Sequence, residues 1–374
     1  MFRQIIILVS LLFCLSCNSR TYEGEKISVN FDKIEEKEHL ASTIFSDMEL
    51  VKLETTTESV LSDIKNIKFY KDNIYIQDII FKGVFVFDMK GKFLKKLDKY
   101  GRGADEYTSI DDFIIDETKN TLEVLNKKDN YIHIYDIDSF EIINTIKIPI
   151  TFVFNFSKND DLYYFQTNKA RNLINRKYTT SEIIVYDPNR NKVYTLMENI
   201  TEDNRHWEFY NIFTKNSNNK LFVSLAWEVD IYYLHKKNIN PTIKINALQK
   251  GIPPEIKSSA YDVKMEYLQS NSMKNKKHFF KLLHKEENDI IIAYGIGYPP
   301  TICHYFNIDS GTKVISTKKI LNDFPPFNLE TIDVFGSDDG KIISALFPVD
   351  LKTETLINTG LKIEDNPALM LFKF

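Results

Sequence analysis

The chain has 374 residues, a length that allows two or three ordinary domains or one large repetitive domain. Its composition, 43% hydrophobic and 27% charged, excludes a disordered or collagen-like chain. The 48 Lys and Arg residues against 52 Asp and Glu give a net charge of −4, which argues against a nucleic-acid partner. The 27 Phe and 20 Tyr residues favour β-strands.

Residues 1–16 have the features of a secretory signal peptide. Arg3 supplies the positive start, and the apolar stretch 5–15 is too short to span a bilayer, which needs about 20 residues. Leu15-Ser16-Cys17-Asn18 resembles the processing site of bacterial lipoproteins, so we expect Cys17 to be the lipidated first residue. Cys14 stands where that site usually has a branched aliphatic residue; ordinary cleavage and an uncleaved anchor are the alternatives.

The cysteine count agrees with lipidation. Cys14 would leave with the signal and Cys17 would carry lipid, which leaves Cys303 without a disulfide partner in an oxidising compartment. We therefore expect a tether over 17–26 and a single folded domain over 27–374. The membrane is a partner through the lipid, and the expected location is the cell envelope, at the outer membrane, on a side that the sequence does not indicate.

A repeated pattern of four strands begins near residue 64. The clearest copy, 64–97, contains an apolar strand, an alternating strand, a strand ending in Asp88 and a further strand. Four third strands superimpose: Val-Phe-Val-Phe-Asp (84–88), Ile-His-Ile-Tyr-Asp (132–136), Ile-Ile-Val-Tyr-Asp (183–187) and Cys-His-Tyr-Phe-Asn (303–307). Copies open near 64, 110, 151, 211, 277 and 331, and repeats of this length with four strands predict an all-β, six-bladed β-propeller.

The chain ends fit a closed ring. Residues 368–374 resemble a third strand, so the sixth sheet lacks its outer strand. The apolar segment 48–54 precedes the first copy and can supply that strand, which would remove an exposed sheet edge. A seventh blade hidden in the long fourth unit is the alternative.

The fourth unit carries an insertion near 253–283 with helical character. Tyr261, Met265 and Leu268 have the spacing of one helix face. A basic run lies nearby, and it is either a solvated rim or a contact for anionic lipid or a polyanion. The basic residues are Lys274, Lys276, Lys277, Lys281 and Lys285.

The segment 100–107, Tyr-Gly-Arg-Gly-Ala-Asp-Glu-Tyr, resembles the junction before the second blade of the six-bladed propeller lipoproteins related to NHL and TolB-like propellers. That family has Gly-x-Gly-Pro-Gly-Glu-Tyr, and here Ala104 and Asp105 replace the Pro and the Gly. The resemblance covers nearly the whole chain and implies a secreted, membrane-tethered propeller. It implies no activity, because propellers include both enzymes and binding modules.

Five residues are candidates for binding a ligand. Arg102, Glu106 and Tyr107 lie in the junction, where Arg102 and Glu106 can instead pair with each other or cap the backbone. Trp207 and Tyr210 lie in a polar stretch between the third and fourth units, where an aromatic ring can stack on a sugar or hold a protein partner, or pack between blades. Trp227 reads as a core residue within a strand.

The candidates for catalysis and metal binding are weak. His133 and His304 share a repeat position with Phe85 and Ile184, which favours packing over metal binding, and Cys303 and His304 should point to opposite faces. The acidic clusters 111–112, 136–138 and 338–339 lack a complete calcium loop. We expect no catalytic residue and no cofactor, with calcium as the alternative.

These observations favour a binding or scaffolding module for a protein, peptide or glycan. Whether it is also an enzyme is open. The rival hypothesis is a metal-dependent lactonase, lyase or hydrolase with acidic residues gathered at the channel. A third hypothesis, based only on the expected lipoprotein signal, is a sensor or assembly partner of an outer-membrane uptake system.

Overall fold

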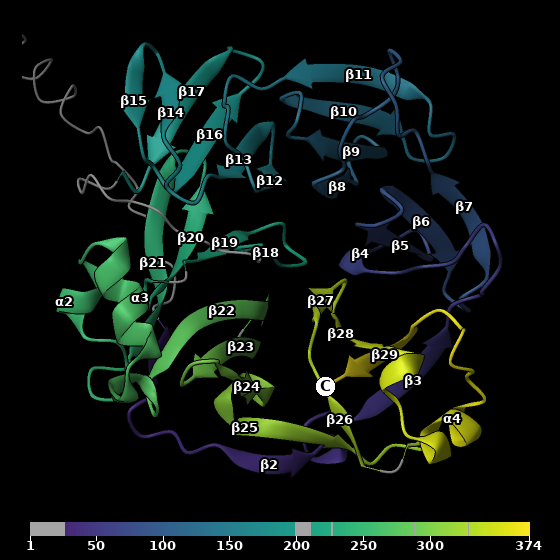
Figure 1. Ribbon diagram of the computed structural model, residues 1–374, viewed down its shortest axis with the longest axis vertical. Coiled ribbons are helices and arrows are strands. Elements are labelled where there is room, and N and C mark those ends of the chain that lie inside the picture. The colour runs from purple at the N-terminus through teal and green to yellow at the C-terminus, as the bar shows by residue number, and fades with distance from the viewer. Residues whose placement is uncertain (1–26, 199–210, 226, 288, 328) are drawn as a thin grey trace, which may run out of the picture.

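Six sheets, each built on four antiparallel strands, surround a central axis, which Figure 1 views end-on. The structure is a computed structural model that describes residues 27–198, 211–225, 227–287, 289–327 and 329–374. Each sheet is one blade, with its first strand nearest the axis (Figure 1). The predicted six-bladed propeller is confirmed.

The strand bounds follow the repeat. Blade 1 consists of β4 (Ile64–Tyr70), β5 (Asn73–Asp78), β6 (Gly83–Asp88) and β7 (Phe93–Leu97). Blade 2 consists of β8 (Asp112–Asp116), β9 (Thr121–Asn126), β10 (Tyr131–Asp136) and β11 (Ile142–Lys147). Blade 3 consists of β12 (Asn155–Asn159), β13 (Leu162–Gln166), β16 (Ile183–Asp187) and β17 (Lys192–Leu196), with the added hairpin β14 (Asn172–Ile174) and β15 (Lys177–Thr179).

The second half of the ring is built in the same way. Blade 4 consists of β18 (Phe213–Lys215), β19 (Leu221–Ser224), β20 (Ile231–His235) and β21 (Asn238–Asn246). Blade 5 consists of β22 (Lys277–Glu286), β23 (Asp289–Ile296), β24 (Thr301–Ile308) and β25 (Lys313–Asn322), with β26 (Glu330–Ile332) paired to β25. Blade 6 consists of β27 (Gly336–Asp338), β28 (Lys341–Leu346), β29 (Ala368–Lys373) and β3 (Asp47–Lys52).

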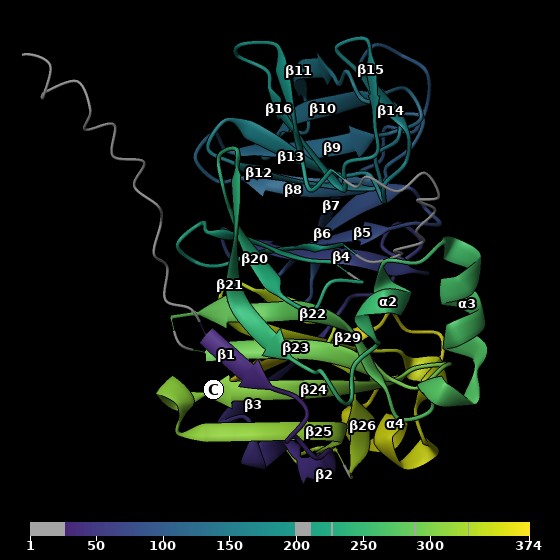
Figure 2. The same ribbon diagram turned by 90° about the vertical axis from the view of Figure 1, so that its left-hand side faces the viewer.

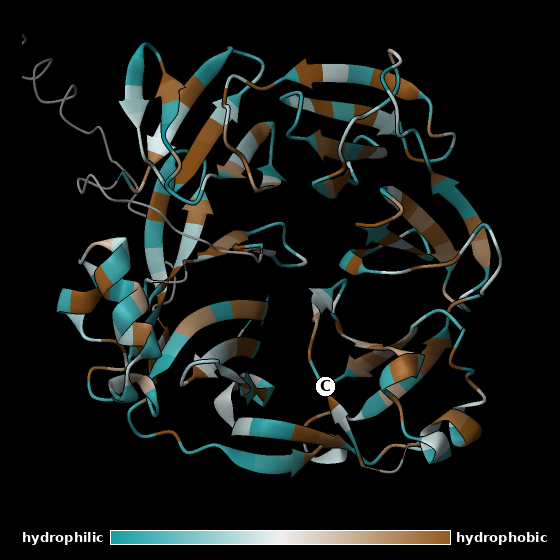
Figure 3. Ribbon diagram, in the orientation of Figure 1, coloured by the Kyte–Doolittle hydropathy of each residue, from teal (hydrophilic) through white to brown (hydrophobic). Residues whose placement is uncertain are grey.

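The core is divided into one apolar cluster for each pair of neighbouring blades. In β6, Phe85 and Phe87 pack toward blade 6, whereas Val84 and Val86 pack toward blade 2. This alternation follows from the period of a strand, whose successive side chains point to opposite faces. Figure 3 shows hydrophobic segments along the strands. Each blade therefore has two buried faces, and both are covered only when the ring is closed.

The ring is closed by β3, the outer strand of blade 6. It pairs antiparallel with β29, with Leu50 opposite Met370. Val51 is buried between blades 6 and 1, and Leu50 packs between blades 5 and 6. The predicted closing strand at 48–54 is confirmed, with a shift of one to two residues at each end.

Two further N-terminal strands, not expected from the sequence, extend blades 4 and 5. β1 (Ile27–Asn30) pairs in parallel with β21, and β2 (Lys37–Leu40) pairs in parallel with β25. Between them, Glu36 forms an ion pair with Lys277 at 2.5 Å. Lys277 is buried, as is Lys285 in the same strand, so the predicted basic run is not a continuous surface.

The repeat register slips by one residue in blade 5. Cys303 and Tyr305 pack toward the preceding blade, blade 4, just as Phe85 packs toward the blade that precedes its own. Phe306 packs toward the following blade, blade 6. The expected equivalence of His133 and His304 is therefore wrong, because a one-residue slip moves a side chain to the other face. Both histidines are nevertheless buried, in agreement with packing positions.

The two faces of the ring differ in their loops. Connections from second to third strands, and from each blade to the next, lie on one face, which we call the long-loop face. Figure 2 shows helices α2 (Pro254–Lys257), α3 (Tyr261–Gln269) and α4 (Thr353–Thr359) on this side. The opposite face carries the remaining connections, which are mostly turns of two to five residues, and we call it the short-turn face.

The insertion at 253–283 contains α2 and α3 and then continues as β22. Trp227, expected within a strand, lies instead in the loop after β19 and packs partly buried beneath α3 against Leu268 and Met273. Within the described ranges, no helix combines the length and apolar character needed to cross a membrane.

Candidate functional site

The junction loop 98–111 connects blades 1 and 2 and contains three of the predicted site residues. Glu106 folds back over the loop, and its carboxylate accepts a hydrogen bond from the backbone N–H of Gly103 at 2.6 Å. A Cβ on Gly101 would lie 1.9 Å from a Glu106 oxygen, so a larger residue there would displace the carboxylate from this position. Glu106 thus caps the backbone, which is one of the structural roles expected for it.

Tyr107 is fully buried beneath this loop. Its hydroxyl donates to the carbonyl of Lys82 at 2.8 Å and lies 3.1 Å from the carbonyl of Leu97. Burial raises the pKa of the Tyr107 hydroxyl far above its usual range. The prediction that Tyr107 contacts a ligand is corrected: this side chain has no accessible surface and instead anchors the loop to blade 1.

Arg102 and Glu106 line one side of a hollow of about 610 Å³ on the long-loop face. The opposite side is formed by the turn after β9, with Lys128 and Asp129. His133 lies at its base. The structure therefore brings two sequence-predicted residues to a shared cavity with charged groups of both signs, although Arg102 and Glu106 form no ion pair with each other.

His133 is held neutral and hydrogen-bonded. Its Nε2 lies 3.3 Å from the Asn126 amide nitrogen and its Nδ1 lies 3.4 Å from the Thr145 hydroxyl. Burial lowers the pKa of the imidazole, although Asp129 opposes this effect. Both ring nitrogens therefore already have protein partners, and His133 supports the base of the hollow as a neutral ring. Its role at this cavity was not foreseen.

A larger cavity, the inter-blade cleft, of about 900 Å³, lies between blades 2 and 3 on the short-turn side. At its deep end, Lys158 bridges two carboxylates, Asp116 at 2.7 Å and Glu123. The Tyr163 hydroxyl donates to the other Glu123 oxygen at 2.7 Å. Near the rim, Lys119 pairs with Asp161 at 2.7 Å.

The buried cluster of the inter-blade cleft is an internally balanced ion network. Burial alone would raise the pKa of Asp116, but hydrogen bonds from Lys158 and Thr118 outweigh it and lower that pKa to about 2. Burial, with Glu123 nearby, raises the pKa of Tyr163 far above its usual range. Both Asp116 and Tyr163 therefore keep fixed protonation states at neutral pH, and the Lys158 ammonium occupies the position between the carboxylates.

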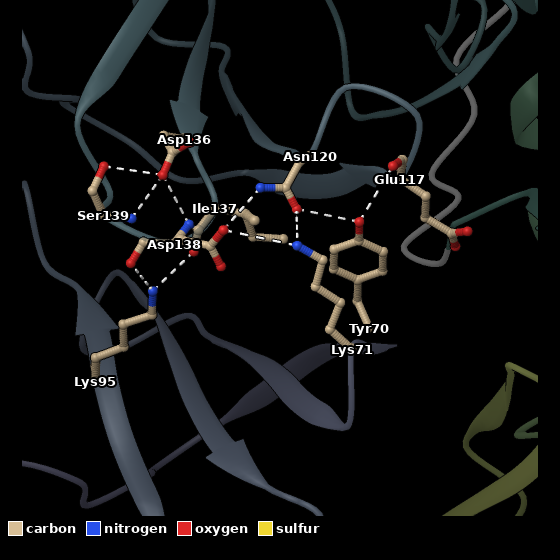
Figure 4. Close-up of polar contacts among 9 residues, drawn as sticks. All are labelled: Tyr70, Lys71, Lys95, Glu117, Asn120, Asp136, Ile137, Asp138 and Ser139. Atoms are coloured by element: carbon tan, nitrogen blue, oxygen red, sulfur yellow. Dashed lines mark hydrogen bonds and ion pairs between the residues drawn. The ribbon is translucent and has the colours of Figure 1, made fainter.

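The acidic cluster 136–138, one of the three considered for calcium, has protein partners (Figure 4). Asp136 accepts hydrogen bonds from the backbone of Asp138 and from Ser139, which closes a turn. The carbonyls of Ile137 and Asp138 accept bonds from the Lys95 ammonium. In the described part of the chain, no group of three metal-binding side chains is assembled.

Exposed apolar side chains are concentrated on the long-loop face. Of 21 large apolar side chains that are exposed, 14 lie in its loops and helices, and Leu173 and Tyr178 lie in the added hairpin β14–β15 within one of its connections. The other five lie in β2 and the strands of the blades: Leu40, Leu94, Ile143, Ile302 and Val314. Among the described residues, the short turns contain none. The longest run is Ile79, Ile80 and Phe81, three consecutive residues exposed by 44%, 60% and 45% at the tip of a loop of blade 1.

Comparison with known proteins gives a family. The model of a family described as a domain of unknown function, DUF4934, matches residues 26–373. The chain belongs to the DUF4934 family. No curated protein matches the DUF4934 chain.

Solved structures resemble the DUF4934 protein in fold. One is a protein of Bacteroides fragilis NCTC 9343 described as exported, with a TM-score of 0.73 and 14% identity over 93% of this chain and 99% of that chain. Another is a member of the DUF4221 family from Bacteroides vulgatus ATCC 8482, with a TM-score of 0.52 and 10% identity over 88% and 97%. Identities this low establish the shared propeller fold alone.

Three predicted site residues of the DUF4934 protein, Cys17, Trp207 and Tyr210, lie outside the described residues. The sequence interpretation missed the inter-blade cleft, because its lining comes from strands and turns of two different blades and has no local spacing in the sequence. It also missed the run 79–81, although three consecutive apolar residues between two strands were a visible signal of an exposed apolar tip.

Proposed function

We propose that this DUF4934 protein is an exported binding module that recognises a protein partner through its long-loop face. The observation that carries this proposal is the run Ile79-Ile80-Phe81. Three neighbouring apolar side chains in water at a loop tip are unfavourable unless a partner covers them, since burying each one contributes about 1.5 to 3 kcal/mol. Scattered single apolar residues would need no such explanation.

The apolar tip belongs to a wider surface, the apolar arc, formed by Val60, Ile79, Ile80, Phe81, Tyr100, Ile357 and Ile363. Backbone and side-chain contacts join its loops. The Ile79 N–H donates to the Asp63 carbonyl, and Asn366 donates to the carbonyls of Glu54 and Ser59. The arc therefore extends over loops of blades 6 and 1 and the junction loop that follows.

A polar border lies beside the apolar arc. The Lys82 ammonium lies 4.0 Å above the Tyr100 ring, and the hollow with Arg102 follows along the same junction loop. An apolar centre with a charged rim is the usual anatomy of a protein interface, with Tyr and Arg among its strongest contributors. This arrangement supports a protein partner over a small polar molecule at this face.

The proposal also includes attachment of the protein to a membrane as a lipoprotein. β1 runs parallel to β21, and β21 runs from the short-turn face to the long-loop face. The chain therefore enters β1 at the short-turn face. A tether over 17–26 that ends in a lipid on Cys17 would arrive from the short-turn side and leave the apolar arc directed away from the membrane. A Cys17→Ala variant should leave the membrane fraction; unchanged partitioning would contradict the tether.

The test of the proposed function uses a triple variant, Ile79→Ser, Ile80→Ser and Phe81→Ser. The parent and the variant are used to capture partners from the envelope of the source cells, and each captured protein is purified and titrated against both. We expect at least a tenfold loss of affinity in the variant. The control replaces three exposed apolar residues within strands, Leu94, Ile302 and Val314, by Ser, and should bind as the parent does.

The enzyme hypothesis gains no support from the buried carboxylates. Asp116 and Glu123 are a buried acidic pair, and Lys158 bridges them. A metal ion there would have to displace that ammonium. The binding role is therefore the function that the geometry supports best.

A further inference from the structure

We propose that the inter-blade cleft is a second binding site, and that its ligand is a neutral carbohydrate. The first observation concerns Thr121, which lines the deep end of the cleft and is 4% exposed. Its hydroxyl has no hydrogen-bond partner, whereas Glu123, Lys158 and Tyr163 beside it are all paired. A buried hydroxyl without a partner is rare and costly, and a rotation of the Thr121 side chain toward the cleft would let a ligand hydroxyl satisfy it.

The charges around the cleft cancel, which selects for a neutral ligand. The lining contains three lysines and two carboxylates, and a third carboxylate, Asp116, lies behind it in an ion pair with Lys158. These groups are Lys119, Lys147, Lys158, Asp116, Glu123 and Asp161. An anionic or a cationic ligand would gain little net attraction and would disturb existing ion pairs.

The remaining lining offers both polar and apolar contacts. The side chains of Asn144, Asn189 and Asn191 lie at the exposed rim and can each donate and accept hydrogen bonds. Ile134 and Ile146 give the wall an apolar surface. A sugar ring has hydroxyls that donate and accept as well as apolar C–H faces, and it matches this mixture. A volume of about 900 Å³ is sufficient for an oligosaccharide.

This inference does not depend on the proposed function. The cleft is bordered by turns of the short-turn face, at Lys119, Asp161 and Asn189, whereas the apolar arc lies on the opposite face. A ligand in the cleft and a protein on the arc could be bound together. Each proposal can therefore fail without the other.

The test begins with the full mature protein on an array of neutral glucans, mannans, galactans and xylans, with anionic polysaccharides and unrelated peptides as further arms. The neutral oligosaccharide with the strongest signal is then titrated by calorimetry against the parent, Thr121→Val and Asn144→Ala. Thr301→Val, an exposed threonine at the start of β24, is the matched control.

We expect saturable binding of at least one neutral oligosaccharide, at least tenfold weaker in Thr121→Val, weaker in Asn144→Ala and unchanged in Thr301→Val. Because valine has the shape of threonine, the melting temperature of Thr121→Val should be equal to or higher than that of the parent. Exclusive binding of an anionic polysaccharide or a peptide, no binding on any arm, or undiminished binding by a folded Thr121→Val would each overturn the proposal.

Discussion

Replacing Lys158 by methionine should destabilise the protein strongly. The substitution keeps most of the length of the side chain and removes the charge that holds Asp116 and Glu123 in the buried cluster. The pKa of Asp116 is lowered from 3.8 to about 2, which corresponds to about 2.4 kcal/mol at about 1.4 kcal/mol per unit. Because Glu123 also loses its partner, we expect a total loss of about 3 to 5 kcal/mol of unfolding free energy at pH 7.

The assay is urea unfolding followed by tyrosine and tryptophan fluorescence at several pH values. The pKa of Asp116 is lowered on folding, so its contribution is complete above about pH 4 and is lost as the pH falls through about 2. In Lys158→Met the Asp116 carboxylate has lost its cation and can take up a proton at a higher pH. The difference between the parent and the variant should therefore shrink between pH 7 and pH 3.

Lys119→Met is the matched control, because Lys119 pairs with Asp161 at the rim of the same cleft, where both side chains are 54% exposed. Exposed pairs contribute less than about 1 kcal/mol. If both variants lost the same free energy, or if the loss in Lys158→Met did not change with pH, the buried network would not have the role described.

Further predictions concern the junction, the free cysteine and the closing strand. Tyr107→Phe removes a buried hydroxyl bonded to backbone carbonyls and should cost about 1 to 2 kcal/mol in urea unfolding, with an unchanged overall circular dichroism spectrum. Burial raises the pKa of the Cys303 thiol to about 12. In a variant whose other two cysteines are replaced by alanine, a thiol reagent should therefore react with Cys303 only after the protein unfolds. Rapid reaction with the folded protein would contradict this burial. Val51→Asp buries an unpaired carboxyl in the closing strand and should cost at least about 3 kcal/mol, whereas Glu49→Ser, exposed on the same strand, should leave the melting temperature nearly unchanged.

The sequence predicted the ring because its strands repeat a local pattern. Aromatic residues followed by an acid, as at Phe87-Asp88 and Tyr135-Asp136, mark third strands that are buried on both faces. The closing strand was predictable for a different reason: a final sheet with an exposed edge needs a partner, and the segment before the first repeat was apolar.

Features that depend on tertiary pairing were not predictable. The strand β2 (Lys37–Leu40) is mostly exposed and has no apolar alternation, so only its pairing with β25 defines it. The one-residue slip around Cys303 follows how blade 5 packs against its neighbours, because third-strand composition alone fits either register. The binding candidates divide similarly: Arg102 and Glu106 lie in a recognisable motif, whereas Thr121 and Lys158 meet only because two blades pack together.

The central claim, that the long-loop face is covered by a protein partner, is tested most directly by site-specific photo-crosslinking in the source cells. A photoreactive phenylalanine analogue is placed at Ile80, at the tip of the apolar arc, or at Leu94 on an outer strand as the control. The account predicts one discrete crosslinked protein from position 80 and none from position 94. The absence of any crosslink at position 80, or the same products at both positions, would contradict it.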